Sequence, residues 1–192
     1  MTRLQRIGEW TPYGLGALLV GGMVHIVSVL AMPALAPRDA YARFASWGPV
    51  NQMARAPQNA GDAPPAFHDR ALVLSICRFD LTQGPVRFTA AVDGEHFLSV
   101  AFQSRTGRIF HSLTDRGALR DRIDVLLLRK EDAAALEDVE EEEASAELRL
   151  TSPTATGLII VRSLAESPQD REGAAARLQR ARCAPEPALN AS

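Results

Sequence analysis

Two cysteines have the most evident chemistry in this 192-residue chain, Cys77 and Cys183. In an oxidising compartment, a bridge that closes a loop of this length stabilises a fold by about 4 to 5 kcal/mol on the chain-entropy model. We expect such a disulfide, attaching the C-terminal helix to a sheet. The alternative is one buried and one incidental thiol, as a cytosolic body would require. Two thiols are too few for a Cys-only zinc site or a four-cysteine iron–sulfur cluster.

The histidines form no recognisable catalytic or metal motif. His68, His96 and His111 are isolated in the chain, without the His-x-x-x-His or zincin spacing that places two ligands on one helix face. No Gly-x-Ser-x-Gly elbow and no Walker loop occurs outside the apolar stretch. The sequence therefore predicts no catalytic residue, no metal site and no cofactor.

The charged residues exclude one class of partner. Twenty-one bases and 23 acids give a formal charge of -2, whereas a general nucleic-acid binder needs a concentrated surplus of Lys and Arg. Eight carboxylates fall between residues 131 and 143 and predict a solvated helix. A loose calcium contact or a surface for a basic partner is the alternative interpretation of that run.

The elements that must position these groups begin with an apolar N-terminal stretch. No formally charged residue occurs from Trp10 to Pro37. Residues 13–32 alone would form a helix of about 30 Å, the thickness of the hydrocarbon core of a bilayer. We predict a cytoplasmic leader over residues 1–12 and a transmembrane anchor over residues 13–36. A buried helix of a soluble domain is the alternative.

A cleaved signal peptide is a second alternative for this stretch. Ala34-Leu35-Ala36 has the small-x-small form that signal peptidase recognises. Pro37 would follow the cut and distort the extended backbone that a protease holds, which favours an uncleaved anchor. The arginines on the two flanks are balanced, so the positive-inside rule does not decide the orientation. A short leader and the expected disulfide predict a single-pass protein of the bacterial inner membrane with a periplasmic body.

Small and polar residues recur every three or four positions along the anchor and therefore share one face of the helix. Such a stripe lets another helix approach closely, and it gives an intramembrane histidine a protein partner in place of lipid. A helix–helix contact, a cofactor ligand and ordinary glycine tolerance are all open interpretations. The stripe comprises Gly14, Ala17, Gly21, His25 and Ser28.

The remainder of the chain predicts an α+β fold. A stalk helix and linker over residues 37–66 precede a β-rich domain over residues 67–183, and a disordered tail over residues 184–192 follows it. About seven short strands in hairpin-like succession indicate a mainly antiparallel sheet or sandwich with flanking helices. The expected strands are residues 71–79, 86–92, 96–103, 108–113, 123–128, 147–150 and 157–164. The expected helices are residues 130–143 and a C-terminal helix that starts at Ser167-Pro168.

Four short stretches carry a resemblance to a known family: Cys77-Arg-Phe-Asp-Leu81, Gly84-Pro-Val-Arg87, Phe97-Leu-Ser-Val100 and Phe110-His-Ser-Leu-Thr-Asp-Arg116. The chain from Gly14 to Cys183 resembles the small bacterial membrane proteins catalogued as domain of unknown function twelve fifty-four. The resemblance implies one N-terminal span, a β-rich extracytoplasmic body and a cysteine late in the chain. It implies no reaction.

Three classes of function are compatible with these patterns. The prediction is a non-enzymatic, membrane-anchored module that binds or assembles another envelope protein. The alternative is a single-span accessory subunit, packed through its helix against a larger photosynthetic or respiratory membrane complex. An enzyme would need a polar pocket in which His96, His111 and Arg116 converge.

Overall fold

The computed structural model describes residues 3–35, 39–56, 69, 71–137 and 148–186. The chain divides into two units, residues 1–38 and residues 39–192. The first unit is the helix α1 (Arg3–Leu35). Within it, the span Pro12–Met32 has a mean hydropathy of 2.2, and no residue of that apolar window is buried inside the protein. One apolar helix is therefore available to anchor the chain in a membrane or to act as a signal sequence, as the sequence predicts.

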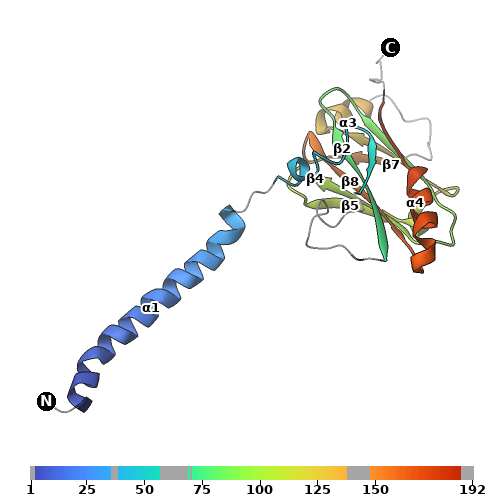
Figure 1. The fold of residues 1–192 in the computed structure, drawn as a ribbon. Coiled ribbons are helices and arrows are strands. Elements are labelled where there is room, and N and C mark those ends of the chain that lie inside the picture. The colour runs from blue at the N-terminus through green and yellow to red at the C-terminus, as the bar shows by residue number, and fades with distance from the viewer. Residues whose placement is uncertain (1–2, 36–38, 57–68, 70, 138–147, 187–192) are drawn as a thin grey trace. The chain divides into compact units, whose positions relative to one another are not determined.

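In the described residues of the second unit, nine strands form two sheets, and the α+β prediction is confirmed (Figure 1). All seven predicted strands are present, with ends within about two residues of those predicted. Every pairing is antiparallel except that of β6 with β7. The first sheet runs β1 (Met53–Arg55), β2 (Leu72–Asp80), β8 (Thr156–Leu164), β4 (Leu98–Ser104), β5 (Ile109–Thr114). The second runs β7 (Leu148–Thr151), β6 (Arg122–Leu128), β3 (Val86–Ala91), β9 (Arg182–Pro185).

The main core lies between the two sheets. Alternate residues of each strand point inward, which is the period-2 pattern that marks them in the sequence. Phe79 and Phe102 of the first sheet and Phe88 of the second have no exposed surface. The rings of Phe88 and Phe102 meet edge to face at 6.0 Å, so aromatic packing joins the sheets directly.

A disulfide joins the same two sheets. Cys77 lies in β2, opposite Ile159 of β8, and Cys183 lies in β9, opposite Phe88 of β3. The expected attachment of a helix to a sheet is wrong, because α4 (Arg171–Gln179) ends before Cys183 and the chain continues as a strand. The expectation of a tail without structure from residue 184 is also wrong for Ala184 and Pro185, which pair with β3. Residues 187–192 lie outside the described part.

The body begins earlier than predicted, because residues 39–56 pack on it. The short helix α2 (Ala40–Arg43) and the turn after it place Tyr41, Phe44 and Trp47 against Ile76, Leu158 and Ile160 on the outer face of the first sheet. Strand β1 then pairs with β2. The predicted stalk and the boundary at residue 67 are therefore wrong for this segment. The predicted linker at residues 57–66 lies outside the described residues.

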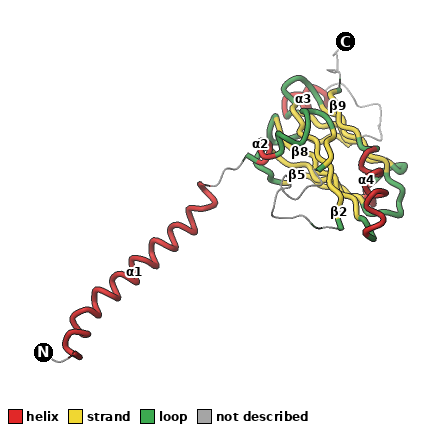
Figure 2. Tube along the Cα trace, viewed as in Figure 1, coloured by secondary structure: helices red, strands yellow, loops and turns green. Residues whose placement is uncertain are grey.

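Two further helices lie beside the sheets of the sandwich (Figure 2). Ser167 caps the turn η2 (Pro168–Asp170), which leads into α4, and the buried Ala174, Ala175 and Leu178 attach α4 to the main core. This is the predicted C-terminal helix. The helix α3 (Lys130–Glu137) begins where the acidic helix was predicted, and the rest of that prediction, residues 138–143, lies outside the described residues.

Candidate functional site

Two loops lie side by side at one end of the sandwich. The first, residues 92–97, joins β3 to β4, and the second, residues 115–121, joins β5 to β6 and contains the turn η1 (Asp115–Gly117). The backbone N–H of Val92 donates to the carbonyl of Asp121 at 2.9 Å. Because both loops are held by strands of different sheets, they form a surface whose position is fixed by the sandwich. We refer to these two loops together as the loop end.

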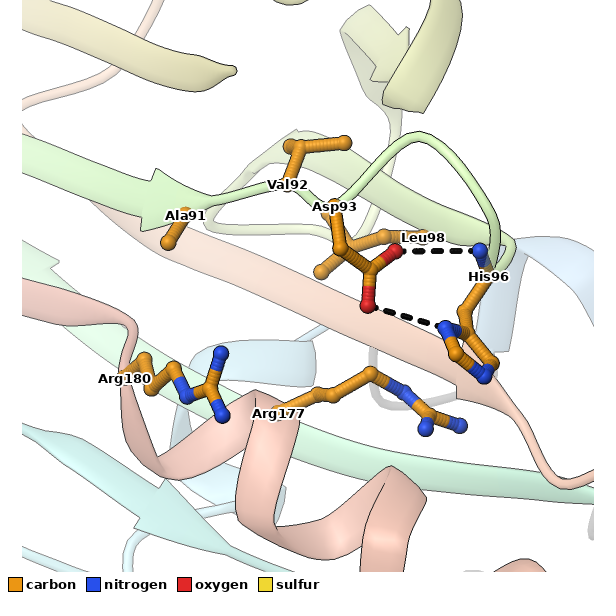
Figure 3. Close-up of a pocket in the computed structure, with 7 residues that line it drawn as sticks. All are labelled: Ala91, Val92, Asp93, His96, Leu98, Arg177 and Arg180. Atoms are coloured by element: carbon orange, nitrogen blue, oxygen red, sulfur yellow. Dashed lines mark hydrogen bonds and ion pairs between the residues drawn. The ribbon is translucent and has the colours of Figure 1, made fainter.

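A small pocket lies where the first loop meets the C-terminal turn of α4 (Figure 3). Its volume is about 40 Å³, which admits a water molecule and is far below the several hundred Å³ of a typical small-molecule site. Figure 3 shows the carboxylate of Asp93 and the ring of His96 facing each other across the loop, with Arg177 and Arg180 on the helix side. The lining residues are Ala91, Val92, Asp93, His96, Leu98, Arg177 and Arg180.

Asp93 organises the first loop. Its Oδ1 accepts from the backbone N–H groups of His96 at 3.0 Å and Glu95 at 3.2 Å, and its Oδ2 lies 2.8 Å from Nδ1 of His96. Burial tends to raise the pKa of Asp93, but the hydrogen bonds from His96 and Glu95 outweigh it, and the net pKa is lowered. The carboxylate therefore stays charged at neutral pH and fixes both the loop and the imidazole.

Arg177 is a structural clamp. Its Nη2 donates to Oδ2 of Asp170 at 2.9 Å and to the carbonyl of Leu164 at 3.0 Å, and its Nε donates to Oγ of Ser163 at 3.3 Å. The hydrogen bond from Arg177 is the main reason that the pKa of Asp170 is lowered. Arg180, one turn further along, forms no ion pair among the described residues. The guanidinium of Arg177 is thus already used by the fold, and the pocket fits a bound water better than a substrate.

The second loop carries a strained two-residue turn. Arg120 and Asp121 have φ values of 53° and 58°, the left-handed region that favours glycine or asparagine. On either side of them, Leu119 and Arg122 exchange two backbone hydrogen bonds of 3.0 and 3.2 Å. Two successive positive φ values between paired residues define a type I′ hairpin turn. The turn projects Leu119, whose surface is 62% exposed.

Large apolar side chains are exposed on both loops. Phe97 of the first loop is 43% exposed and Leu119 of the second is 62% exposed. Arg116 and Arg120, also exposed, belong to the same loop as Leu119. Apolar and aromatic groups beside arginines are the composition of protein–protein interfaces. The loop end is therefore chemically suited to bind another protein, with Phe97 and Leu119 as anchors.

The structure places only two of the three residues that an enzyme would need in one region. His96 and Arg116 belong to the loop end, whereas His111 lies in β5, pairs with Phe102 and has its ring 6.2 Å from the Phe102 ring. In the described part of the chain, no group of three or more His, Cys, Asp or Glu is placed to hold a metal ion. Sequence reasoning did not single out Leu119 or Arg177. No Asn-Gly or Asp-Gly pair marks the turn at Arg120-Asp121, so its usual signal is missing.

The five residues of the predicted stripe all lie in α1. Apart from neighbouring residues and the backbone of α1 itself, no described atom lies within 4 Å of where a Cβ of Gly14 or Gly21 would stand, and Ala17, His25 and Ser28 are exposed in this unit. The stripe is therefore available for contact with another helix. The two cysteines predicted to pair are the two that the disulfide joins.

Residues 50–185 match the model of a protein family described as "Protein of unknown function (DUF1254)". The chain belongs to this family. The matched DUF1254 region covers more than half of the chain and contains all nine described strands. Within the described body, it leaves out only the start of the segment 39–56 and Glu186. The resemblance seen in the sequence is thereby confirmed.

Two crystal structures match this chain, and the first of them has a similar fold. The VPA0106 protein from Vibrio parahaemolyticus is 12% identical with a TM-score of 0.56, and the match covers 77% of this chain and 34% of that one. An uncharacterized protein from Burkholderia cenocepacia is 15% identical with a TM-score of 0.47, covering 67% of this chain and 36% of that one. This DUF1254 chain thus spans about a third of the length of the solved structures that it resembles. The comparison with curated proteins gave no match.

Proposed function

We propose that this protein is a non-enzymatic module, anchored in the bacterial inner membrane, whose periplasmic body binds or assembles another envelope protein. The observation that carries the proposal is the loop end. Phe97 and Leu119 are exposed there on two loops that a backbone hydrogen bond joins. Exposed apolar anchors on a rigid scaffold bind a partner with little loss of conformational entropy.

The disulfide supports the periplasmic location. Both cysteines are buried in the core, Cys77 completely and Cys183 at 6% exposure, so the bridge is an integral part of the sandwich. Structural disulfides form in oxidising compartments and are rare in the cytosol. A topology with the predicted leader, residues 1–12, on the cytoplasmic side and the body on the other side agrees with this requirement.

The exposed surface of α1 supports the anchor. No residue of the apolar window in Pro12–Met32 is buried inside the protein, although the mean hydropathy of this window is 2.2. A bilayer removes such side chains from water without any help from the body. Membranes washed with alkaline carbonate are expected to retain the protein, and its release into the supernatant would contradict the anchor.

A second candidate function is that of an accessory subunit bound through α1. His25 is the observation that favours it, because an imidazole inside an apolar span needs a hydrogen-bond partner that lipid tails do not supply. It lies on the same stripe as Ala17 and Gly21, whose small side chains permit close approach of a neighbouring helix.

Site-specific photo-crosslinking in intact membranes separates these functions. We place a photoreactive residue at Phe97 or Leu119 for the loop end, at Ala17 or Gly21 for the stripe, and at the exposed Gln52 as a control. The proposed function predicts the same crosslinked envelope protein from both loop positions and none from Gln52. Crosslinks that arise only from the stripe support the accessory subunit and reject the module.

A pair of substitutions tests whether the loop residues supply the affinity. Leu119→Arg should reduce recovery of the crosslinked partner roughly tenfold, the effect of losing an interface anchor worth about 1.4 kcal/mol. Val50→Arg replaces an exposed apolar residue next to β1 and serves as the matched control. Equal recovery with both variants would contradict a role for the loop end.

A further inference from the structure

Among the described residues, the strand β5 is a sheet edge without the usual protection. It borders the first sheet and pairs only with β4 among the described strands. Edges normally carry charges or proline, or are very short, because an open edge pairs readily with another strand. The other three edge strands are short and charged. The strand β1 has three residues and includes Arg55, and β7 has four and includes Arg149. The strand β9 has four residues and includes Arg182 and Pro185. The six residues of β5 include neither a formal charge nor a proline.

The hydrogen-bonding groups of β5 alternate between β4 and the open side. Ser104 N–H donates to the carbonyl of Arg108 at 2.9 Å, so the backbone of Arg108 faces β4. The register of β5 on β4 then pairs Ile109 with Gln103, His111 with Phe102 and Ser112 with Ala101, and Phe110 is the extra residue of a bulge. Along these pairing positions, starting from Arg108, the backbone N–H and C=O groups of every second residue face away from β4. The outward positions are Ile109, Ser112 and Thr114.

This pattern is symmetric about Ser112. A two-fold axis through Ser112 would place Ser112 opposite the same residue of a second copy, with its N–H and C=O facing that copy as an antiparallel hydrogen-bonded pair requires. Because the bulge residue Phe110 shares a pairing position with His111, the strand has equal numbers of pairing positions on either side of Ser112. Ile109 then faces Thr114 of the second copy, and His111 faces Leu113.

The flanking charges are complementary in the same register. One ladder position beyond Ile109 and Thr114 stand Arg108 and Asp115, so each Arg108 would face Asp115 of the other copy. Neither side chain forms an ion pair among the described residues, and Arg108 is exposed. On the outer face, Ile109 is 54% exposed, and Ser112 and Thr114 are also exposed. A β-branched residue opposite threonine is a favourable cross-strand pair.

We propose that two copies of this chain associate through antiparallel pairing of their β5 strands about Ser112. The pairing joins the first sheets of two bodies into one continuous sheet, with two Arg108–Asp115 ion pairs at its ends. The contact is isologous, so it closes at a dimer and does not propagate. It involves β5, Arg108 and Asp115, the first residue of the second loop, and it does not use Phe97 or Leu119, which stay available for a different protein.

Engineered disulfides in the full chain in lipid nanodiscs test the register. Ser112→Cys should give a crosslinked dimer under mild oxidation, because residues paired across the axis have Cα atoms about 5.5 Å apart. Thr151→Cys, exposed on the edge strand β7, is the matched control and should stay uncrosslinked. A Ser112→Cys variant that remains monomeric, or that crosslinks only to another protein in membranes, overturns the proposal.

Charge reversal tests the ion pairs and guards against misfolding. Arg108→Asp and Asp115→Arg should each weaken dimerisation roughly tenfold, as two attractive pairs become repulsive. The double variant restores opposite charges and should recover the dimer, which a folding defect would not do. Arg116→Asp is the control of equal charge change. Failure of the double variant to recover dimerisation would reject this register.

Discussion

The centre of the sandwich and its loop end are built in opposite ways. At the centre, β2 and β8 of one sheet face β3 and β9 of the other, and Cys77–Cys183 and the Phe88–Phe102 contact join the sheets. At the loop end, Phe97 and Leu119 are exposed and two residues in succession have positive φ. The centre buries its apolar side chains, whereas the loop end exposes apolar surface and retains backbone strain.

This difference indicates a division of labour. Substitutions at the centre should lower the free energy of unfolding and leave recognition intact in whatever folds. Substitutions at the loop end should change binding with little effect on stability, because strain retained by a fold tends to mark functional positions. Experiments that mix the two outcomes would break this comparison.

The largest effect is expected from removing the disulfide. The bridge spans a sequence separation of 106. Loss of a bridge that closes a loop of this size costs about 4 to 5 kcal/mol on the chain-entropy model. The variant Cys77→Ala with Cys183→Ala should therefore unfold at much lower urea concentration than the wild type, followed by Trp47 fluorescence in detergent.

A reductant provides the control for that measurement. Once it has opened the bridge, the wild type should approach the stability of the double variant, and the double variant itself should not respond. A stability loss below about 1 kcal/mol would mean that the unfolded chain gains little freedom when the bridge is absent.

The next effect is expected at Gly157, at the start of β8. A Cβ there would overlap the carbonyl of Gln103 and the ring of Phe79, neither of which can move away freely. Gly157→Ala should cost about 1 to 3 kcal/mol, the usual penalty of overpacking a core. Gly117→Ala is the control, since its Cβ would meet only Leu113 Cδ2 at 3.6 Å, and it should change stability little. Equal effects in thermal melts would show that the centre relaxes more easily than its packing indicates.

The regular part of this fold is readable from the sequence because burial imposes period-2 patterns. Each of the seven predicted strands alternates apolar residues over at least four positions or runs apolar through the core, and each is present. The strands β1 (Met53–Arg55) and β9 (Arg182–Pro185) were missed because neither has a clear local pattern of alternating apolar residues. Their identity depends on long-range pairing with β2 and β3, which no local pattern encodes.

The functional features also divide into those that the sequence predicts and those that depend on tertiary contacts. Cys77 and Cys183 could be paired by composition, since there are only two cysteines. The stalk prediction for residues 39–56 was wrong because the apolar residues there are compatible with a free helix as well as with a packed turn. Their contacts with Ile76 and Ile160 of the first sheet determine that they pack on the body. The loop end depends on Val92 meeting Asp121, a contact between loops of different sheets. Tertiary contacts of this kind override local preference.

A smaller, pH-dependent effect is expected at Asp170. Its hydrogen bond with Arg177 lowers its pKa in the folded protein below the ordinary 3.8. Protons therefore bind the unfolded state first, so the interaction stabilises the fold above about pH 4 and is lost as the pH falls below 3.8. Arg177→Met should flatten that part of the stability profile. Arg180→Met, which removes a neighbouring charge without an ion pair, should keep the wild-type slope; equal flattening would assign the effect to overall charge.

The smallest change in stability, and the sharpest test of the comparison, is Asp121→Gly. Glycine adopts the φ of 58° without a Cβ clash, so the variant should gain about 0.5 to 1 kcal/mol, less the entropy glycine adds to the unfolded chain. Arg122→Gly, one residue on and within β6, should instead lose stability. If the strain serves recognition, photo-crosslinking from Leu119 should weaken in the more stable Asp121→Gly protein, because the turn then holds Leu119 less rigidly. Unchanged crosslinking together with higher stability would show that this strain is incidental to binding.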